Sequence, residues 1–356
     1  MEKTPSLSQL LQLAVKHEAS DLHLSVGYPP ILRVNGVLTT LPLPPYTNDR
    51  LENELLSLLD THQRQRLQVD KNIDFAFSTP DARFRVNIFY QLAGIAAAVR
   101  VLSTRIRTLE DLPAPPALAD LVRKKQGLIL VTGPTGCGKS TTLAAMIDRI
   151  DSERHAHIIT IEDPIEYIFE GRNCLINQRE IGRHAKSFAE ALRSALREDP
   201  DVILVGEMRD LETISLALTA AETGHLVLST LHTNNVAETV DRVINVFPGE
   251  QQNFIRHIFA NVIQGIISQS LVSKRDGTRR IAVMEVLIAT PAIRNLIREN
   301  KSHQILSVVQ MSTQEKMQTF DQALISLYNE GLISYDTVIS FARDPAFVES
   351  SVKMSK

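Results

Sequence analysis

The stretch GPTGCGKST at residues 133–141 decides how the rest of the chain is interpreted. It fits the pattern G-x-x-x-x-G-K-[S/T], it follows the apolar run GLILVT, and it opens a segment with helical spacing. Glycines let the main-chain N–H groups of such a loop face phosphate oxygens, and the start of a helix adds partial positive charge. The stretch therefore predicts a phosphate-binding loop between a strand and a helix.

Two side chains of this loop carry specific chemistry. We expect Lys139 to reach the β- and γ-phosphates of ATP, and Ser140 to ligate Mg²⁺. The alternative is a glycine-rich turn that binds no ligand. The predicted nucleotide-binding residues of the loop are Gly133, Pro134, Thr135, Gly136, Cys137, Gly138, Lys139, Ser140 and Thr141.

The segments around the loop indicate an α/β fold. From Gln126 onward, the short apolar runs GLILVTG, HIITIED, DVILVGE and LVLSTLH alternate with helical segments. Strands that are apolar throughout are typical of a sheet covered on both faces. After about residue 285 the pattern is mostly helical to the end. We therefore expect a doubly covered sheet followed by a helical C-terminal region.

The first hundred residues predict a separate, smaller α/β domain. Asn35-Gly36 lies between two β-type runs, which is a strong signal for a tight hairpin. In RFRVNIFY, residues 83–90, arginine and asparagine alternate with apolar side chains, as in a half-buried strand. Three prolines within residues 105–117 predict a stiff interdomain connector.

Acidic residues end two of the apolar strands. Glu207 closes DVILVGE, and a P-loop ATPase needs a carboxylate at such a position to activate the attacking water. Glu162 and Glu166 belong to TIEDPIEY, where clustered carboxylates repel one another unless a cation or proton lies between them. We predict Glu207 as general base, with Glu166 and Glu162 near Mg²⁺ or water. The alternatives are a solvated strand end and a turn at Asp163-Pro164.

Histidines and arginines complete the predicted site. The strand GHLVLSTLHTN has His225 at its start and His232 at its carboxyl end, where the γ-phosphate is expected. Arg83, Arg85 and Arg100 lie in the smaller domain and are candidates for stabilising the transferring phosphate. Exposed strand arginines are otherwise simply solvated.

The composition excludes several other classes of protein. The formal net charge is −3 with no long single-sign run, so we expect no nucleic-acid partner. Two cysteines, Cys137 and Cys174, predict neither a disulfide framework nor a four-cysteine zinc site, and favour a reducing, cytoplasmic compartment. No signal peptide is recognised. Residues 257–273 are predicted to form an amphipathic core helix, so we expect membrane contact only through a partner.

The four blocks, in this order and spacing, resemble the type II/IV secretion ATPase superfamily (the GspE/PilT family). Within it, the chain is similar to the retraction ATPases of type IV pili over nearly its whole length. GPTGCGKST corresponds to the Walker A motif, TIEDPIEY to the Asp box, DVILVGEMRD to Walker B and GHLVLSTLHTN to the His box. The resemblance implies that six chains form a ring that hydrolyses ATP to power retraction of pili. It also implies that Arg85 and Arg100 reach the nucleotide, with Arg83 less favoured.

The same resemblance assigns domains. It implies a PAS-like N-terminal domain (1–104), a linker (105–117), a RecA-like P-loop ATPase domain (118–290) and a helical C-terminal region (291–356). The family's retraction signature AIRNLIRE is present without a substitution as Ala292, Ile293, Arg294, Asn295, Leu296, Ile297, Arg298 and Glu299.

The retraction signature has implied partners. In the family it is linked to retraction and is not part of the phosphate site, so we expect its paired arginines to couple subunit motion to a neighbour or partner. The implied partner is the inner-membrane platform protein at the pilus base, contacted from the cytoplasm. A PilU-like paralogue is a further candidate.

One departure from the family pattern is Cys137, where serine is usual. A helix start lowers a thiol pKa, so the sequence predicts a reactive thiol and an activity sensitive to alkylation.

Four alternative functions remain. They are an accessory PilU-like retraction ATPase, a pilus assembly or type II secretion ATPase, a conjugation-type ATPase, and a nucleotide-binding regulatory protein without turnover.

Overall fold

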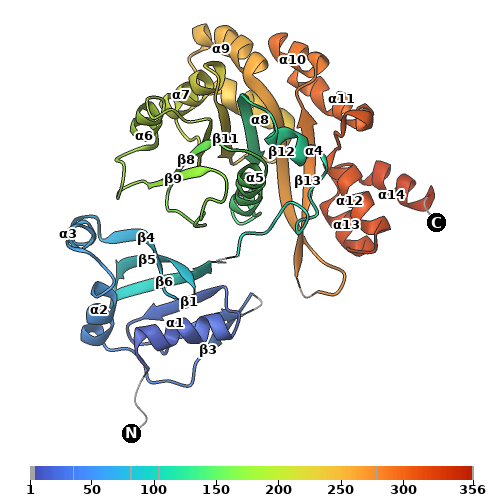
Figure 1. Cartoon of the computed structure of the whole chain (residues 1–356). Helices are drawn as coiled ribbons and strands as arrows, with labels where there is room; N and C mark the ends of the chain where they lie inside the picture. Colours follow the sequence, from blue (N-terminus) through green and yellow to red (C-terminus); the bar gives the residue numbers. More distant parts are fainter. Residues whose placement is uncertain (1–4, 35, 81, 103–104, 278, 355–356) are drawn as a thin grey trace. The chain divides into compact units, whose positions relative to one another are not determined.

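The computed structural model describes residues 5–34, 36–80, 82–102, 105–277 and 279–354 (Figure 1). The chain divides into two compact units. Unit 1 comprises Met1–Arg105 together with Pro164–Ile168, and unit 2 comprises Ile106–Asp163 together with Phe169–Lys356.

Unit 1 is built on a six-stranded antiparallel sheet in the order β3-β2-β1-β6-β5-β4. Its strands are β1 (Asp21–Ser25), β2 (Ile31–Val34), β3 (Val37–Thr40), β4 (Asn72–Ser78), β5 (Arg83–Gln91) and β6 (Gly94–Leu102). Its helices are α1 (Leu7–Lys16), α2 (Asn48–Leu56) and α3 (Thr61–Asp70). The predicted alternation in β5 is confirmed, because Phe84, Val86 and Ile88 are at most 1% exposed.

The predicted hairpin joins β2 and β3. Val34 pairs with Val37, so the two strands are antiparallel and two residues apart. Gly36 has a φ of 84°, as a tight hairpin turn requires. Asn35, the other half of the predicted turn, lies outside the described residues.

Unit 2 is built on a seven-stranded sheet in the order β13-β12-β7-β11-β10-β8-β9. Its strands are β7 (Gly127–Thr132), β8 (His157–Glu162), β9 (Leu175–Glu180), β10 (Val202–Val205), β11 (Leu226–Leu231), β12 (Ile263–Ser273) and β13 (Arg280–Ile288). All neighbouring strands are parallel except β12 and β13. The four apolar runs around the loop are thus strands, as predicted.

Helices cover both faces of this sheet (Figure 1). Successive strand residues point to opposite faces, so Leu128 and Leu130 of β7 pack in one core and Ile129 and Val131 in another. The second core contains α4 (Ala117–Val122) and α5 (Lys139–Glu153). The first contains α6 (Phe188–Ala195), α7 (Leu211–Glu222), α8 (Val236–Asn245) and α9 (Gly249–Val262). The predicted α/β class is therefore confirmed.

The prediction of one amphipathic helix over residues 257–273 is wrong. Helix α9 ends at Val262, and β12 begins at the next residue, between β7 and β13. Because this strand is buried on both faces, it needs no alternation, and its apolar residues imitate helical spacing. Among the described residues, no helix is both long and apolar enough to cross a membrane.

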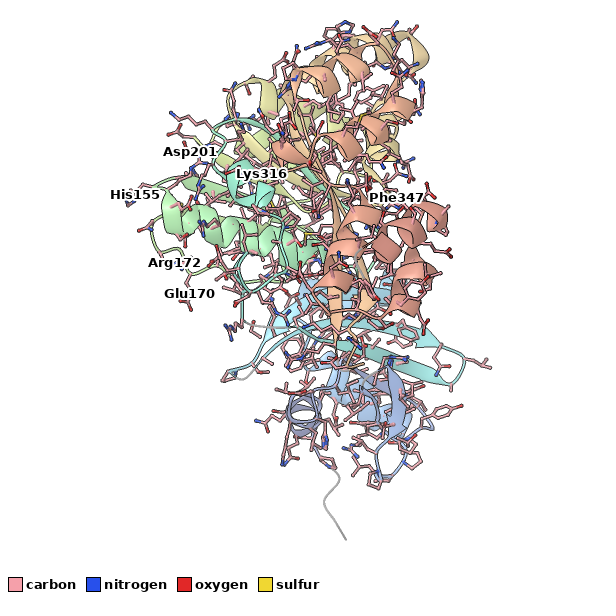
Figure 2. All side chains as sticks on the ribbon, turned by 90° about the vertical axis from the view of Figure 1, so that its right-hand side faces the viewer. His155, Glu170, Arg172, Asp201, Lys316 and Phe347 are labelled. Atoms are coloured by element: carbon pink, nitrogen blue, oxygen red, sulfur yellow. The ribbon has the colours of Figure 1, made fainter. Side chains whose placement is uncertain are left out.

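The C-terminal region is helical, as expected. It contains α10 (Pro291–Arg298), α11 (Ile305–Met311), α12 (Phe320–Asn329), α13 (Tyr335–Phe341) and α14 (Pro345–Met354), with short 3₁₀ turns η1 (Ser302–Gln304) and η2 (Thr313–Glu315). The last three helices pack on Val272, Ile281 and Val283 near the hairpin end of β12 and β13. Figure 2 shows Phe347 on α14. It also shows Lys316 beside α4, where its Nζ donates a hydrogen bond to Asp120 Oδ2.

The proline-containing segment 105–117 packs against unit 2. Leu109 is only 6% exposed and lies in the core that holds α4 and α5. Leu112 and Ala114 pack against the same core. From Ile106 onward this segment belongs to unit 2.

Candidate functional site

The sheet of unit 2 gathers the predicted site at one edge. Strands β7, β11, β10 and β8 are consecutive and parallel, so their carboxyl ends lie together. The glycine-rich loop follows β7, His232 follows β11, Glu207 follows β10 and Glu162 ends β8. In open α/β sheets this edge is where ligands bind. The topology therefore explains why four segments far apart in the chain serve one site.

The loop between β7 and α5 has the geometry of a phosphate cradle. Gly133 has a φ of 140°, and a Cβ there would lie 2.2 Å from the main-chain oxygen of Gln269. Gly138 has a φ of 92° and is the residue from which α5 begins. These positions accept only glycine, and the helix start after them favours an anion. The residues present thus fit a nucleotide phosphate.

Lys139 points back over the loop. Its Nζ donates to the main-chain oxygens of Gly133 at 2.8 Å and Pro134 at 3.1 Å. Ser140 follows in the first turn of α5, half-buried, where a hydroxyl is available to a divalent cation. The predicted roles of both side chains are compatible with these positions.

His232 links Lys139 to Glu207. Its Nδ1 lies 3.4 Å from Lys139 Nζ, and its Nε2 lies 3.2 Å from Glu207 Oε1. The lysine ammonium can only donate, so Nδ1 accepts and the ring proton is on Nε2, facing the carboxylate. A neutral imidazole in this tautomer satisfies both contacts. The structure thus brings together three residues that the sequence placed in one site.

Glu207 is held as a carboxylate. Its partial burial raises its pKa, but the hydrogen bond and charge of Arg209, with the hydrogen bond from His232, outweigh this and leave the pKa of Glu207 below its ordinary value. Arg209 Nη2 donates to Glu207 Oε2 at 2.7 Å. Arg209 was not among the site residues predicted from the sequence, although it lies only two residues after the proposed base. A carboxylate that is ionised near neutral pH can accept a proton from water.

Glu162 and Glu166 belong to different units. Glu162 Oε1 accepts hydrogen bonds from Thr160 Oγ1 at 2.6 Å and Gln178 Nε2 at 3.2 Å, within unit 2. Glu166 belongs to unit 1, where its Oε1 lies 3.9 Å from Arg85 Nη1. The two glutamates of TIEDPIEY therefore have different surroundings: Glu162 lies at the end of β8, and Glu166 lies near Arg85.

The arginines of unit 1 form a pair across two strands. Arg85 and Arg100 are opposite each other on β5 and β6, so their side chains share one face of the sheet. Two like charges in this arrangement repel. Asp74 and Asp21 offset the repulsion, at 2.6 Å from Arg85 and 3.0 Å from Arg100 respectively.

Arg83 has different surroundings. It is 8% exposed and donates from Nε and Nη2 to the main-chain oxygen of Ile165, at 3.0 and 2.7 Å. Its Nη1 donates to Ser78 Oγ at 2.9 Å. These contacts hold the Arg83 guanidinium against the main chain at Ile165 and the hydroxyl of Ser78.

His225 does not lie at the loop of its own chain. It precedes Leu226, which pairs with Gly127 at the start of β7, whereas the loop follows the end of β7. A strand of this length separates the two by roughly 20 Å at about 3.3 Å per residue. His225 Nδ1 instead lies 2.9 Å from the main-chain oxygen of Ala220. His225 therefore lies at the opposite edge of the sheet from the loop of its own chain, and its predicted contact with nucleotide stays a prediction.

The predicted low pKa of Cys137 is wrong. The residue is only 3% exposed, and burial raises the pKa of its thiol despite the neighbouring Lys139. Its side chain lies under the loop, where a Cβ on Gly133 would be 2.8 Å from its sulfur. Desolvation of the thiolate therefore outweighs the helix start that motivated the prediction.

The two arginines of α10, Arg294 and Arg298, make different contacts with the end of α9. Arg294 Nη1 donates to the main-chain oxygens of Ala260 and, at 2.6 Å, Asn261, which end α9. Burial, with the charge of Arg298, lowers the pKa of Arg294. Arg298 makes a longer contact of 3.4 Å to Asn261 Oδ1. Arg294 thus caps the end of α9, whereas Arg298 is held less tightly and is more available to contact a partner.

Comparison with known proteins agrees with this arrangement. The family described as "Type II/IV secretion system protein" matches residues 2–279. The "Type IV pilus retractation ATPase PilT" of Pseudomonas aeruginosa is 48% identical over 340 residues, covering 95% of this chain and 98% of that protein. The "Twitching motility protein" of Neisseria gonorrhoeae is 51% identical over 306 residues, covering 86% of this chain and 82% of that protein.

A solved structure is similar over almost the whole chain. The crystal structure of the pilus retraction motor PilT with bound ADP has a TM-score of 0.89 at 46% identity. The match covers 97% of this chain and 99% of that one. With the family matched over residues 2–279 and these identities over most of its length, the chain belongs to the type II/IV secretion system protein family.

Proposed function

We propose that this protein is the motor ATPase of type IV pilus retraction, a PilT, which hydrolyses ATP to withdraw pilin subunits. The observation that carries the proposal is the contact chain from Lys139 through His232 to Glu207, beside a loop shaped for phosphate. A protein that only binds nucleotide needs no carboxylate poised in this way. The relatives named as retraction and twitching motility proteins support the type of work that the hydrolysis drives.

The residues of unit 2 divide the chemistry among them. The loop N–H groups and Lys139 bind the phosphates of ATP, and Glu207 accepts the proton of the attacking water. His232 donates from Nε2 to Glu207 and so holds this carboxylate in position at the edge where the γ-phosphate binds. Mg²⁺, when bound through Ser140, supplies charge neutralisation on the phosphate oxygens. Glu162 provides a further carboxylate at the same edge.

The arginine pair of unit 1 is assigned a different role. Arg85 and Arg100 carry positive charge that offsets the charge developing on the transferring phosphate, and Glu166 orients Arg85. We propose that six chains form a ring and that a neighbouring subunit takes part in each site. Nucleotide turnover then changes the angle between the units of each chain.

The proposed partner is the inner-membrane platform protein at the pilus base, contacted from the cytoplasm through surfaces that include α10. A PilU-like paralogue is a second proposed partner. An accessory PilU-like role is the alternative within the family, and pilus assembly is the nearest alternative outside retraction. In both alternatives the same unit 2 site hydrolyses ATP.

The deciding experiment is a count of surface pili in a strain lacking this gene, complemented with wild type, Glu207→Gln or the control Glu222→Gln. Glu222 is exposed and at the far end of α7 from the loop. We expect many pili without twitching for the deletion and for Glu207→Gln, with recovery by wild type and the control. Bald cells would mean that the chain drives assembly. Equal phosphate release by purified wild type and Glu207→Gln would refute Glu207 as the base.

A further inference from the structure

Gln269 is a buried polar residue that lies beside the phosphate-binding loop but outside all four motifs. It is on β12, next to Ser268, which pairs with Thr132 at the end of β7. The residue is only 2% exposed. A buried amide requires partners for both its oxygen and its nitrogen, so its contacts show what it holds in place.

Gln269 contacts both ends of the loop and the helix that follows. Its Nε2 donates to the main-chain oxygen of Cys137 at 2.7 Å, and its Oε1 accepts from Thr142 Oγ1 at 2.9 Å. Its own main-chain oxygen lies so close to Gly133 that a Cβ there would be 2.2 Å away. Gln269 of the neighbouring strand thus contacts the loop at its first glycine, Gly133, and near its end, at Cys137.

The chemistry of these partners selects an amide. A main-chain oxygen can only accept a hydrogen bond, so the group that faces Cys137 has to be a donor. The group that faces Thr142 accepts from a hydroxyl that is itself buried. Glutamate would present an oxygen to the oxygen of Cys137, and leucine would leave both partners unsatisfied inside the protein.

We propose that Gln269 is a positioning residue that holds the loop in the conformation that binds nucleotide. It acts on the loop main chain and not on the reacting atoms, so it pre-organises the N–H groups before the phosphates arrive. Its loss therefore weakens nucleotide binding and raises KM more than it lowers kcat. This inference rests on the proposed binding of ATP by the same loop.

The experiment measures fluorescent ADP binding, and ATP turnover, by the full-length protein with Gln269→Glu. The matched control is Gln318→Glu, because Gln318 Nε2 donates to the main-chain oxygen of Met284 at the same 2.7 Å, away from the loop. Thr142→Val is a milder variant that removes only the donor to Gln269. Lys139→Ala marks the loss of the loop itself.

We expect Gln269→Glu to weaken ADP binding about tenfold or more. Thr142→Val should also weaken ADP binding, but by a smaller factor than Gln269→Glu. The control Gln318→Glu should bind ADP like wild type. Wild-type affinity in Gln269→Glu, or equal losses in Gln269→Glu and Gln318→Glu, would overturn the inference. If Gln269→Glu does not fold, Thr142→Val decides in the same way. Absence of ADP binding by wild type and Lys139→Ala alike would refute the proposed function and, with it, the inference.

Discussion

Arg343 Nη1 donates to Glu285 Oε2 at 2.7 Å, and the carboxylate that it neutralises is fully buried. Arg343 also bonds the main-chain oxygen of Asn234, two residues after His232, and covers the Phe320 ring at 4.4 Å. One side chain between α13 and α14 thus joins the C-terminal helices to β13 and to the loop that carries a site residue.

This ion pair predicts a large loss of stability when it is broken. Arg343→Met leaves Glu285 buried without a cation, which should lower the free energy of unfolding by about 3–5 kcal/mol. Replacing both residues, as Glu285→Leu with Arg343→Met, should recover most of the loss because no charge remains buried. Denaturant unfolding at neutral pH measures the stability of the single and the double variant. The control is Arg193→Met, because Arg193 forms an exposed ion pair with Glu212. Equal stability of Arg343→Met and the control would contradict the prediction.

The same pair predicts a dependence on pH. Burial raises the pKa of Glu285 although Arg343 opposes the shift. A carboxyl whose folded pKa is raised favours folding while it is protonated, and stability falls as the pH rises above its unfolded value. Without Arg343 the shift is larger, so Arg343→Met should lose less stability at pH 5 than at pH 8. Equal losses at both pH values would mean that Glu285 stays ionised in the variant.

Arg209 should set the acid limb of ATP turnover. Its hydrogen bond and charge are the main causes that bring the pKa of Glu207 below its ordinary value against the effect of burial. Arg209→Met should therefore raise that pKa, so that the base becomes protonated at a higher pH. We expect the acid limb of kcat/KM to move to higher pH relative to wild type. An unshifted limb in Arg209→Met would mean that another group controls it.

Cys137 should react slowly with alkylating agents. Burial raises the pKa of its thiol, and the same holds for Cys174, which is 8% exposed. We expect iodoacetamide to label neither cysteine of the folded protein at the rate of a free thiol, and to label both after denaturation. Mass spectrometry distinguishes the two sites. Rapid labelling of Cys137 in the folded protein, with loss of activity, would restore the prediction made from sequence.

The two arginines of the retraction signature should behave differently. Arg294→Ala leaves the terminal carbonyls of α9 without their charged donor, which should cost about 1.5–3 kcal/mol of stability. Arg298→Ala should leave stability and ATP turnover nearly unchanged and still abolish retraction. Thermal unfolding, phosphate release and twitching of both variants provide the measurement. Normal twitching of Arg298→Ala would exclude this arginine as the coupling residue.

Local patterns were sufficient for much of the fold and the site. The loop at residues 133–141 combines a glycine pattern, a strand before it and a helix after it, all within a few residues of one another. Glu207 and His232 could be identified because each follows an apolar strand, and the carboxyl ends of parallel strands share one edge. These inferences need only neighbouring residues and a rule of topology.

Other features depended on segments distant in the chain. Residues 263–273 are a strand because β7 and β13 pair with them on both sides, and a strand buried on both faces has no alternation to reveal it. Arg294 became a helix cap because the end of α9 packs beside α10. Gln269 lies 132 residues from Cys137, whose main-chain oxygen it binds.

The sequence by itself determined the α/β class, the glycine-rich loop between a strand and a helix, and the placing of Glu207 and His232 at strand ends, because these depend on local periodicity and on spacing from strand ends. Only the tertiary structure decided that Cys137 is buried, that His225 faces the opposite edge, and that Gln269 brackets the loop. Burial and hydrogen-bond partners are set by which distant elements pack together. Neither can be calculated from the residues on either side of a position.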